Sequence, residues 1–404
     1  MNHHRRHDGK VDGLRTRATW AELFYDIVLA FGVSQTTHIL AHKPSWETFG
    51  EALLVLTPLW WAWVDVALAV NTVEETHVER LLLLAAGLAT YGMGVAAPRA
   101  MSGHGEAALF ALSFLLLRLL MGEATRRERP FARTIHPYSA GLTFALALIG
   151  GAFLAPGPRA AVWAAAILAE AVLPALMSSR LHGMTYSAAH LPERFGLFII
   201  IALGENILTV GAGASTGALT GALIAALVLS FVIGGALWWL YFHLAAPAVE
   251  HSLRTHHTPA TVVRDVLGYG HLVLVTGLLL VAVGTGRTVA HPTDVSHDPT
   301  AALLPIGAAI FALTFGYTRW RMFGAASATR IGVGLCLLGL AAGAPFLPAI
   351  ATLGATALLL VGVNGLEHWL VATGRTVPLV FHRAEPFGAR SNQDQIHSAN
   401  GELT

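Results

Sequence analysis

A glutamate lies deep within one apolar stretch of the chain. Residues 190–211 read HLPERFGLFIIIALGENILTVG, and Glu205 follows Glu193 by twelve residues. On a helix that rises about 1.5 Å per residue, this spacing is roughly 18 Å. Glu205 therefore lies near or just past the middle of a hydrocarbon core about 30 Å thick. An ionised carboxylate at this depth is costly, so Glu205 must be paired, protonated or used in a function.

Two interpretations of Glu205 stay open. No basic residue lies within two turns of Glu205 on the same helix. An apolar setting favours the protonated form of a carboxyl group. Asn206 is its neighbour, and Gln35 and His38 on the first apolar run lie at a similar depth. The group is either a proton- or cation-handling site or a protonated Glu205 that hydrogen-bonds to the first helix.

A second layer of ionisable residues recurs near one end of several apolar runs. Glu22 and Asp26 are four residues apart, so they share one face of a helix. The other members of this layer are Asp65, Arg118, Glu193, Arg194, His243, His271, Glu367 and His368. These groups could line one polar vestibule at the cytoplasmic face. Alternatively, the arginines neutralise the acids and hold the helices together, and Arg118 then forms an ion pair with Asp26 or Asp65.

Several residues could instead support chemistry at the inner leaflet. His190, Glu193, His243 and His271 could act as acid and base in a lipid-modifying enzyme. The GxSxG sequence around Ser215 lies between helices, whereas a nucleophile elbow follows a strand. The chain has no nucleotide-binding fingerprint, which argues against transport driven by ATP on this chain alone. We predict no catalytic residue set, no metal and no cofactor.

The composition favours a membrane protein. Hydrophobic residues make up 54% of the 404 residues, charged residues make up 12%, and mean hydropathy is +0.59. Soluble domains carry about 25% charged residues. The net charge of +1 gives no reason to expect a nucleic-acid partner, so we expect lipids and a small solute or ion as partners. Apolar faces can serve lipid or another subunit, which leaves a homo-oligomer open.

Twelve apolar runs are long enough to span a bilayer as helices. They cover residues 20–41, 50–71, 81–98, 106–122, 138–155, 159–178, 192–212, 217–243, 268–289, 302–320, 330–345 and 347–371. The sequence thus predicts an all-α, polytopic membrane protein. The short break at Gly343–Pro348 leaves a count of eleven open.

The arginines and lysines predict the orientation. With twelve spans and an inside N-terminus, cytoplasmic segments hold 20 of the 25 basic residues, and the outer loops hold Lys43, Arg99, Arg159 and Arg287. Basic residues are retained on the cytoplasmic side of a membrane. We therefore expect a protein of the bacterial inner membrane with both termini in the cytoplasm.

The two halves of the chain could be parallel repeats. An offset of 171 residues aligns ELFYDIVLAFGVSQ with ERFGLFIIIALGEN, matching Glu22 to Glu193 and Gln35 to Asn206. We therefore divide the chain into a basic arm (1–19), two six-helix halves (20–178 and 179–375) and a flexible tail (376–404). Apolar helices also match by chance, so the duplication stays open.

The chain resembles the bacterial low temperature requirement protein A (LtrA) family from about residue 15 to 375. The segments that carry this resemblance are ATWAELFYDIVLAF, HLPERFGLFIIIALGE, WWLYF at Trp238–Phe242 and YGH at Tyr269–His271. The resemblance implies a multi-pass bacterial membrane protein, and the family name describes a growth phenotype without a mechanism. Arg17 and Phe24-Tyr25-Asp26 also resemble the Arg and Phe-Ser-Asp motif of lysosomal and bacterial potassium channels, with Tyr25 in place of Ser.

Our leading hypothesis is a secondary transporter or channel for a small solute or ion. Its pathway residues would be Glu205, Asn206, Glu22, Asp26, Asp65, Arg118, Glu193, Arg194, Gln35, His38 and His271. An intramembrane lipid-modifying enzyme and a membrane scaffold in stress or low-temperature adaptation are the alternatives.

Overall fold

The computed structural model describes residues 18–72, 76–126, 139–176, 186–215, 218–256 and 258–381. Within them, twelve long helices coincide one by one with the predicted apolar runs. Their bounds are α1 (Trp20–His42), α2 (Trp46–Thr72), α3 (His77–Ala96), α4 (His104–Arg126), α6 (Ser139–Ala152), α7 (Pro156–Leu176), α9 (His190–Ala214), α10 (Gly221–Leu240), α13 (His271–Ala290), α14 (Leu303–Phe323), α15 (Ala328–Gly343) and α16 (Ala349–Ala372).

Ten of the described helices are long and apolar enough to cross a membrane, and α6 contains a shorter apolar segment, Gly141–Ala152. The prediction of an all-α polytopic membrane protein is therefore confirmed. The short 3-10 helix η6 (Ala344–Phe346) and Pro348 separate α15 from α16, because proline lacks the backbone N–H that a continuous helix would need.

Shorter elements join the long helices. They are the 3-10 helices η2 (Ala97–Arg99) and η5 (Pro299–Ala302), the π-helices η3 (Tyr241–Ala245) and η4 (Val263–Gly270), the helices α11 (Ala246–Thr255) and α12 (Pro259–Val262), and two strands, β1 (Ala326–Ser327) and β2 (Leu379–Val380). The strands pair antiparallel, with Ala326 opposite Val380. The last described residues of the expected tail thus run beside the start of α15. Residues 1–17 of the basic arm and the tail from residue 382 lie outside the described residues, while Thr19, the last residue of the predicted arm, caps α1 by accepting from the backbone N–H of Glu22.

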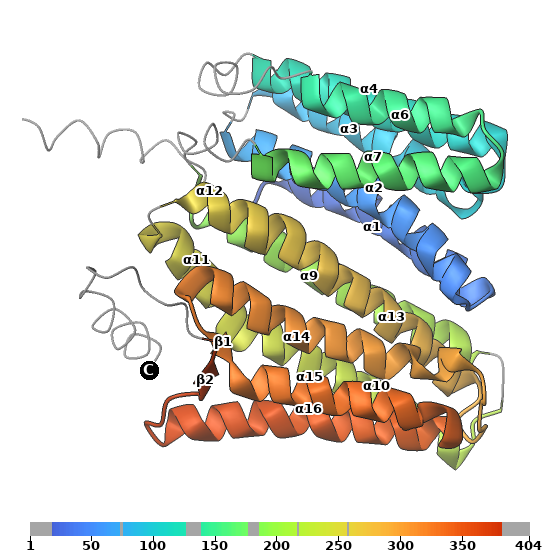
Figure 1. Cartoon of the computed structure of the whole chain (residues 1–404), viewed down its shortest axis with the longest axis vertical. Coiled ribbons are helices and arrows are strands. Elements are labelled where there is room, and N and C mark those ends of the chain that lie inside the picture. The colour runs from blue at the N-terminus through green and yellow to red at the C-terminus, as the bar shows by residue number, and fades with distance from the viewer. Residues whose placement is uncertain are drawn as a thin grey trace, which may run out of the picture. The chain divides into compact units, whose positions relative to one another are not determined.

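The described chain forms two compact units (Figure 1). Unit 1 consists of the residues up to Glu205 together with Ala246–Val275, and unit 2 consists of Asn206–Ala245 and the residues from Thr276 onward. This division follows packing and does not test the predicted repeat boundary at residue 178, which stays a prediction.

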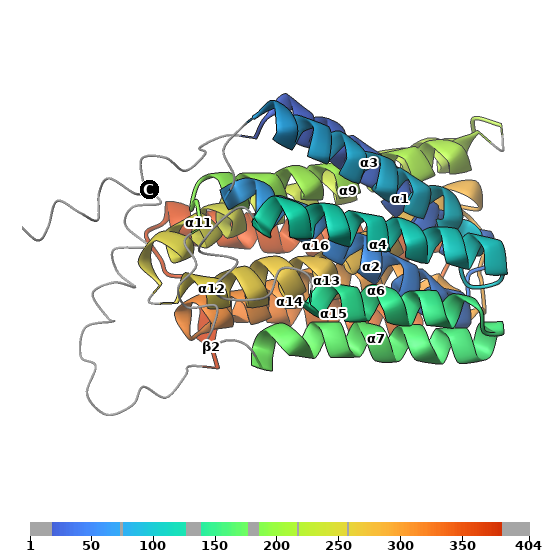
Figure 2. The same cartoon turned by 90° about the horizontal axis from the view of Figure 1, so that it is seen from above.

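In unit 1, α2 is the most enclosed helix, since it packs against α1, α3, α4 and α7. The helices α3, α4, α6 and α7 pack as successive neighbours, as Figure 2 shows. Trp60 and Trp63 on α2 are fully buried, and their rings contact Phe195 and Phe198 of α9. This aromatic packing fixes α2 against the first half of α9.

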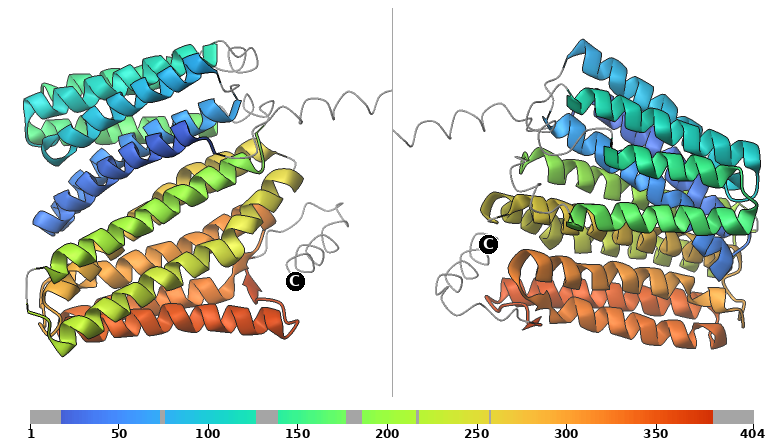
Figure 3. Two further views of the ribbon diagram at one scale, coloured as in Figure 1. Left: turned by 180° about the vertical axis from the view of Figure 1, so that it is seen from behind. Right: turned by 45° about the horizontal axis from the view of Figure 1, so that its top comes forward.

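In unit 2, α14 packs against α15 and α16, and α10 packs against α16 (Figure 3). Close backbone contact joins α13 to α14, where a Cβ atom on Gly307 would lie 2.5 Å from the carbonyl oxygen of Gly277. Small residues at such crossings permit the close helix packing that membrane helices use.

The surface of α3 carries an apolar stripe. Leu81, Leu84, Leu88, Tyr91 and Val95 are all exposed and recur every three or four residues. This spacing places them on one helix face. An exposed apolar face of this length suits contact with lipid chains better than contact with water.

A buried arginine ties together two helix connections of unit 1. Arg159, in the first turn of α7, is fully buried, and its guanidinium donates to the carbonyl oxygens of Ala100, Gly103, Ala152 and Leu154 at 2.9–3.2 Å. The carbonyl groups of Ala152 and Leu154 lie at and just after the end of α6, and those of Ala100 and Gly103 lie in the connection after α3. The connections after α3 and α6 therefore lie at the same end of unit 1, as alternating spans require.

We expect Arg159→Gln to destabilise unit 1 by about 2–4 kcal/mol, because it leaves buried carbonyl groups without donors. Thermal unfolding in detergent should show a lower midpoint for this variant. Arg99→Gln is the control, since Arg99 is largely exposed and its ion pair within the described residues is with the partly exposed Glu106. Equal midpoints for the two variants would contradict the role of Arg159.

Candidate functional site

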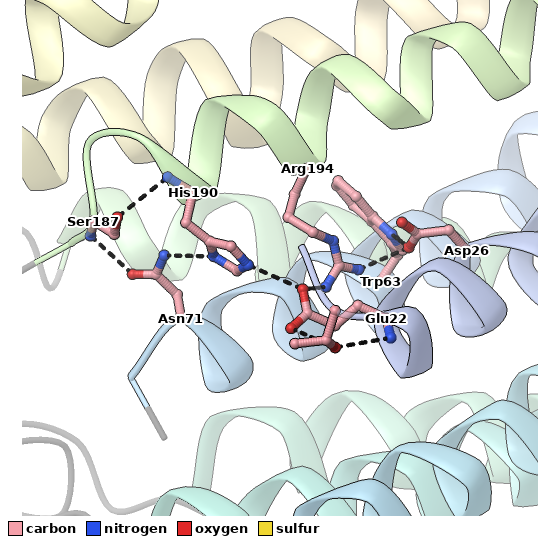
Figure 4. Close-up of polar contacts among 8 residues, drawn as sticks. Glu22, Asp26, Trp63, Asn71, Ser187, His190 and Arg194 are labelled. Carbon is pink, nitrogen blue, oxygen red and sulfur yellow. Dashed lines mark hydrogen bonds and ion pairs between the residues drawn. The ribbon is translucent and has the colours of Figure 1, made fainter. Parts of the chain in front are cut away.

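A buried polar network joins α1, α2 and α9 in unit 1 (Figure 4). We call it the inner network, and it consists of Glu22, Asp26, Trp63, Asn71, Ser187, His190 and Arg194. The first turns of α1 and α9 and the last turns of α2 carry most of its side chains. These helix ends meet in unit 1, so the network joins residues that are far apart in the sequence.

Arg194 is the centre of the inner network. Its side chain is fully buried, Nη1 donates to Glu22 Oε2 at 2.7 Å, and Nη2 donates to Asp26 Oδ1 at 2.7 Å. Its guanidinium carbon lies 5.8 Å from the centre of the Trp63 ring. One cation thus bridges two carboxyl groups of the same helix face.

Asp26 uses only one of its two oxygens. Oδ1 accepts from Arg194 and also from the indole N–H of Trp63 at 2.8 Å. Oδ2 is buried and has no hydrogen-bond partner within the described part of the chain. A buried carboxyl oxygen without a donor is costly, so Oδ2 is the atom of this network best suited to carry a proton or to contact a cation.

The hydrogen bonds around His190 define which of its nitrogens carries a proton. The backbone N–H of Ser187 donates to Asn71 Oδ1 at 3.0 Å, which turns the Asn71 amide nitrogen toward His190 Nδ1 at 3.1 Å. Because an amide nitrogen only donates, Nδ1 accepts. The proton of a neutral His190 is then on Nε2, which donates to Glu22 Oε2 at 3.0 Å.

A second cluster in unit 1 connects α2, α4 and α7. Arg118 pairs with Asp65, and its Nη2 donates to Glu170 Oε1 at 2.7 Å. The guanidinium carbon also lies 4.9 Å from the centre of the Phe114 ring. We call this cluster the Arg118 triad. Of the two acids considered for Arg118, the structure therefore places Asp65 beside it, while Asp26 contacts Arg194.

Glu170 was not among the residues selected from the sequence. It is the one acid within α7, in the apolar run AAAILAEAVLPAL. A lone carboxylate in an apolar run was the signal that singled out Glu205, and the same signal could have found Glu170.

Unit 2 holds a third ion pair and a buried hydrogen bond. Arg330 at the start of α15 donates to Glu367 of α16 at 3.0 Å, and both side chains are buried. The hydroxyl of Thr285 donates to Asn206 Oδ1 at 2.6 Å. Six members of the predicted layer of charges thus fall in these clusters: Glu22, Asp26 and Arg194 in the inner network, Asp65 and Arg118 in the Arg118 triad, and Glu367 in the pair with Arg330.

The remaining predicted residues differ in burial. Glu205 is buried, Gln35 is half-buried, and Glu193 and His38 are exposed. His271 is buried, with Nδ1 at 2.9 Å from the carbonyl oxygen of Val266.

The residues considered as acid and base of an enzyme differ in burial, since His190 and His271 are buried and Glu193 and His243 are exposed. His190 belongs to the inner network and Glu193 is exposed on the same helix. His243 is an exposed residue of unit 2, where its ring lies 4.9 Å from Trp239.

The fold and its buried ion pairs define the class of the protein: it is a multi-pass membrane protein with charges inside its helical units. The chain belongs to the bacterial low temperature requirement A protein (LtrA) family, which matches residues 17–364. The resemblance recognised in the sequence is therefore confirmed. The chain is also 31% identical over 293 residues to an uncharacterized protein of Rhizobium meliloti (strain 1021), a match that covers 69% of this chain and 71% of that protein. No solved structure matches the chain.

We expect Arg194→Gln to destabilise the protein by about 3–5 kcal/mol, because it leaves two carboxyl groups in a buried site without their cation. The double variant Glu22→Gln with Arg194→Gln should lose less than the sum of the two single variants. Thermal unfolding of the four proteins in detergent measures this coupling.

Glu193→Gln is the matched control for this cycle, because Glu193 is adjacent to Arg194 in the chain but exposed. It should leave the unfolding midpoint unchanged. Additive effects of Glu22→Gln and Arg194→Gln would show that the pair does not hold α1 to α9.

Proposed function

We propose that the protein is a secondary transporter or channel that moves a small solute or ion across the membrane, and that Asp26 carries an exchangeable proton during this movement. The observation that carries the proposal is the inner network, in which two carboxyl groups share one guanidinium inside a helical membrane protein. Intramembrane ionisable residues commonly mark ion pathways and proton relays.

The charges of the inner network support a proton on Asp26. Among the described residues, the network holds the carboxyl groups of Glu22 and Asp26, the guanidinium of Arg194 and an imidazole whose hydrogen bonds fit its neutral form. Asp26 shares the Arg194 guanidinium with a second carboxyl group, that of Glu22, so this cation compensates the charge of Asp26 only in part. A proton on Asp26 Oδ2 removes that charge and fills the position at which the described residues provide no donor.

The Arg118 triad supports the same mechanism at a second site. It also combines two carboxyl groups, Asp65 and Glu170, with one guanidinium. Its side chains are slightly exposed, whereas those of the inner network are almost completely buried. The residues of the two sites lie toward the N-terminal ends of α1 and α9 and toward the C-terminal ends of α2, α4 and α7. A proton could therefore enter at the triad and reach the inner network.

The proposed residues have distinct roles. Asp26 binds and releases the proton, Arg194 sets the charge that favours release, and His190 donates to Glu22 and holds its carboxyl in place. Trp63 orients Asp26 through Oδ1 and leaves Oδ2 free for exchange. We further propose a bacterial inner-membrane location with both termini in the cytoplasm, which rests on the distribution of basic residues.

Proton and potassium flux in liposomes tests this proposal. We expect wild-type protein to conduct or exchange ions, and Asp26→Asn to lose most of that flux, because an amide cannot take up and release a proton. Glu205→Gln measures the contribution of the buried carboxyl on α9. Arg99→Gln, which changes an exposed residue outside the proposed pathway, should keep wild-type flux.

Folding must be verified for each variant by size-exclusion profile and thermal midpoint. Flux in Asp26→Asn equal to that of wild type would contradict the role of Asp26. An inserted, folded wild type that moves neither ion would contradict an ion pathway and turn the search to uncharged solutes and lipid chemistry.

A further inference from the structure

Unit 2 contains a cavity lined by the end of α13, the loop that follows it and the start of α16. Its volume is about 160 Å³, which holds a small solute, since a single water needs about 10–15 Å³. The polar side chains in its wall include Arg287, Thr288, His291, Ser296, Thr300 and Thr352. This cavity is separate from the inner network and from the Arg118 triad, whose residues all belong to unit 1.

The guanidinium of Arg287 is the main charged group of this cavity. Arg287 is half-buried in the last turn of α13, and within the described part of the chain its one hydrogen bond goes to the hydroxyl of Thr300. A guanidinium has five N–H donors in a planar fork that matches a carboxylate or phosphate. Most of these donors therefore remain available to a ligand.

Thr352 supplies an independent sign of a ligand. Its side chain is 4% exposed and lines the cavity, and Oγ1 has no hydrogen-bond partner within the described residues. Buried hydroxyl groups are normally hydrogen-bonded. A ligand oxygen in the cavity would provide the missing partner.

The wall of the cavity is held in place by backbone contacts. The loop after α13 pairs with the start of α16, where Ala349 N donates to Asp294 O at 2.9 Å and Ile350 N donates to Pro292 O at 2.8 Å. Val295 and Pro348 add an isolated bridge. These backbone hydrogen bonds hold the loop after α13 against the start of α16 and so fix the wall of the cavity.

The other charged groups of the wall do not oppose an anion strongly. Asp294 and His291 lie 3.6 Å apart, and their side chains are 67% and 73% exposed. Exposed charges are screened by water and salt. The half-buried guanidinium therefore sets the local preference.

We propose that this cavity binds a small oxyanion, meaning a solute or headgroup with a carboxylate, phosphate or sulfate group. Arg287 forms a two-pronged contact with the anion, and the Thr352 hydroxyl donates to one of its oxygens. By the predicted orientation, the cavity opens on the side of the membrane away from the cytoplasm.

Titration calorimetry on the purified full chain, with inorganic phosphate, sulfate and acetate as probes, tests the proposal. We expect saturable binding of at least one probe, a loss of affinity of about tenfold or more in Arg287→Gln, and a smaller loss in Thr352→Val. Arg99→Gln should bind like wild type, because Arg99 is an exposed arginine of unit 1.

Two results would overturn the proposal. The first is the absence of saturable binding of all three probes to folded wild type. The second is an unchanged affinity in both Arg287→Gln and Thr352→Val. Thr352→Val exchanges a hydroxyl for a methyl group of similar size, so it tests the site even if Arg287→Gln does not fold.

A lipid headgroup and a free solute are distinguished by repeating the phosphate titration in nanodiscs. If phosphatidylglycerol lowers the apparent phosphate affinity of wild type relative to phosphatidylcholine, and leaves Arg287→Gln unaffected, the site holds the headgroup of an anionic lipid. Equal affinity in the two lipids supports a free oxyanion.

Discussion

The bridge from Arg194 to Glu22 and Asp26 is the interaction on which the arrangement of unit 1 depends. It connects the first turns of α1 and α9, which are 168–172 residues apart in the chain. Removing one partner of a buried ion pair costs more than the pair contributes, because the remaining charge stays in a medium of low dielectric constant. Hydrophobic burial gives membrane helices little preference for one neighbour over another. The ion bridge and the aromatic cluster of Trp60, Trp63 and Phe195 supply that preference.

A two-to-one ratio of carboxyl groups to guanidinium recurs in unit 1. The inner network and the Arg118 triad are built on different helices, yet each places one arginine between two acids. One acid per arginine would suffice to balance the charge of each cluster. Under the proposed function, the extra acid in each cluster is the group that gains or loses a proton.

The helices could be predicted from the sequence, and the partners of the charges could be predicted only in part. Apolar runs long enough to cross a bilayer are a local property, and every predicted run coincides with a helix. Arg194 and its acids could be expected to pair because a lone charge in the membrane is costly. The choice of Asp65 over Asp26 for Arg118 could not be predicted, since it depends on which helix faces are adjacent. Asn71 and Ser187 were missed because neutral polar residues at helix ends are common and carry no comparable signal.

The protonation of Asp26 is the central claim, and infrared difference spectroscopy of the protein in liposomes tests it most directly. Acidic and alkaline buffers are compared for wild type, Asp26→Asn and Glu193→Gln. The account predicts a carbonyl band of a protonated carboxyl group that is present in wild type and Glu193→Gln and absent in Asp26→Asn. A band of equal intensity in wild type and Asp26→Asn would contradict it.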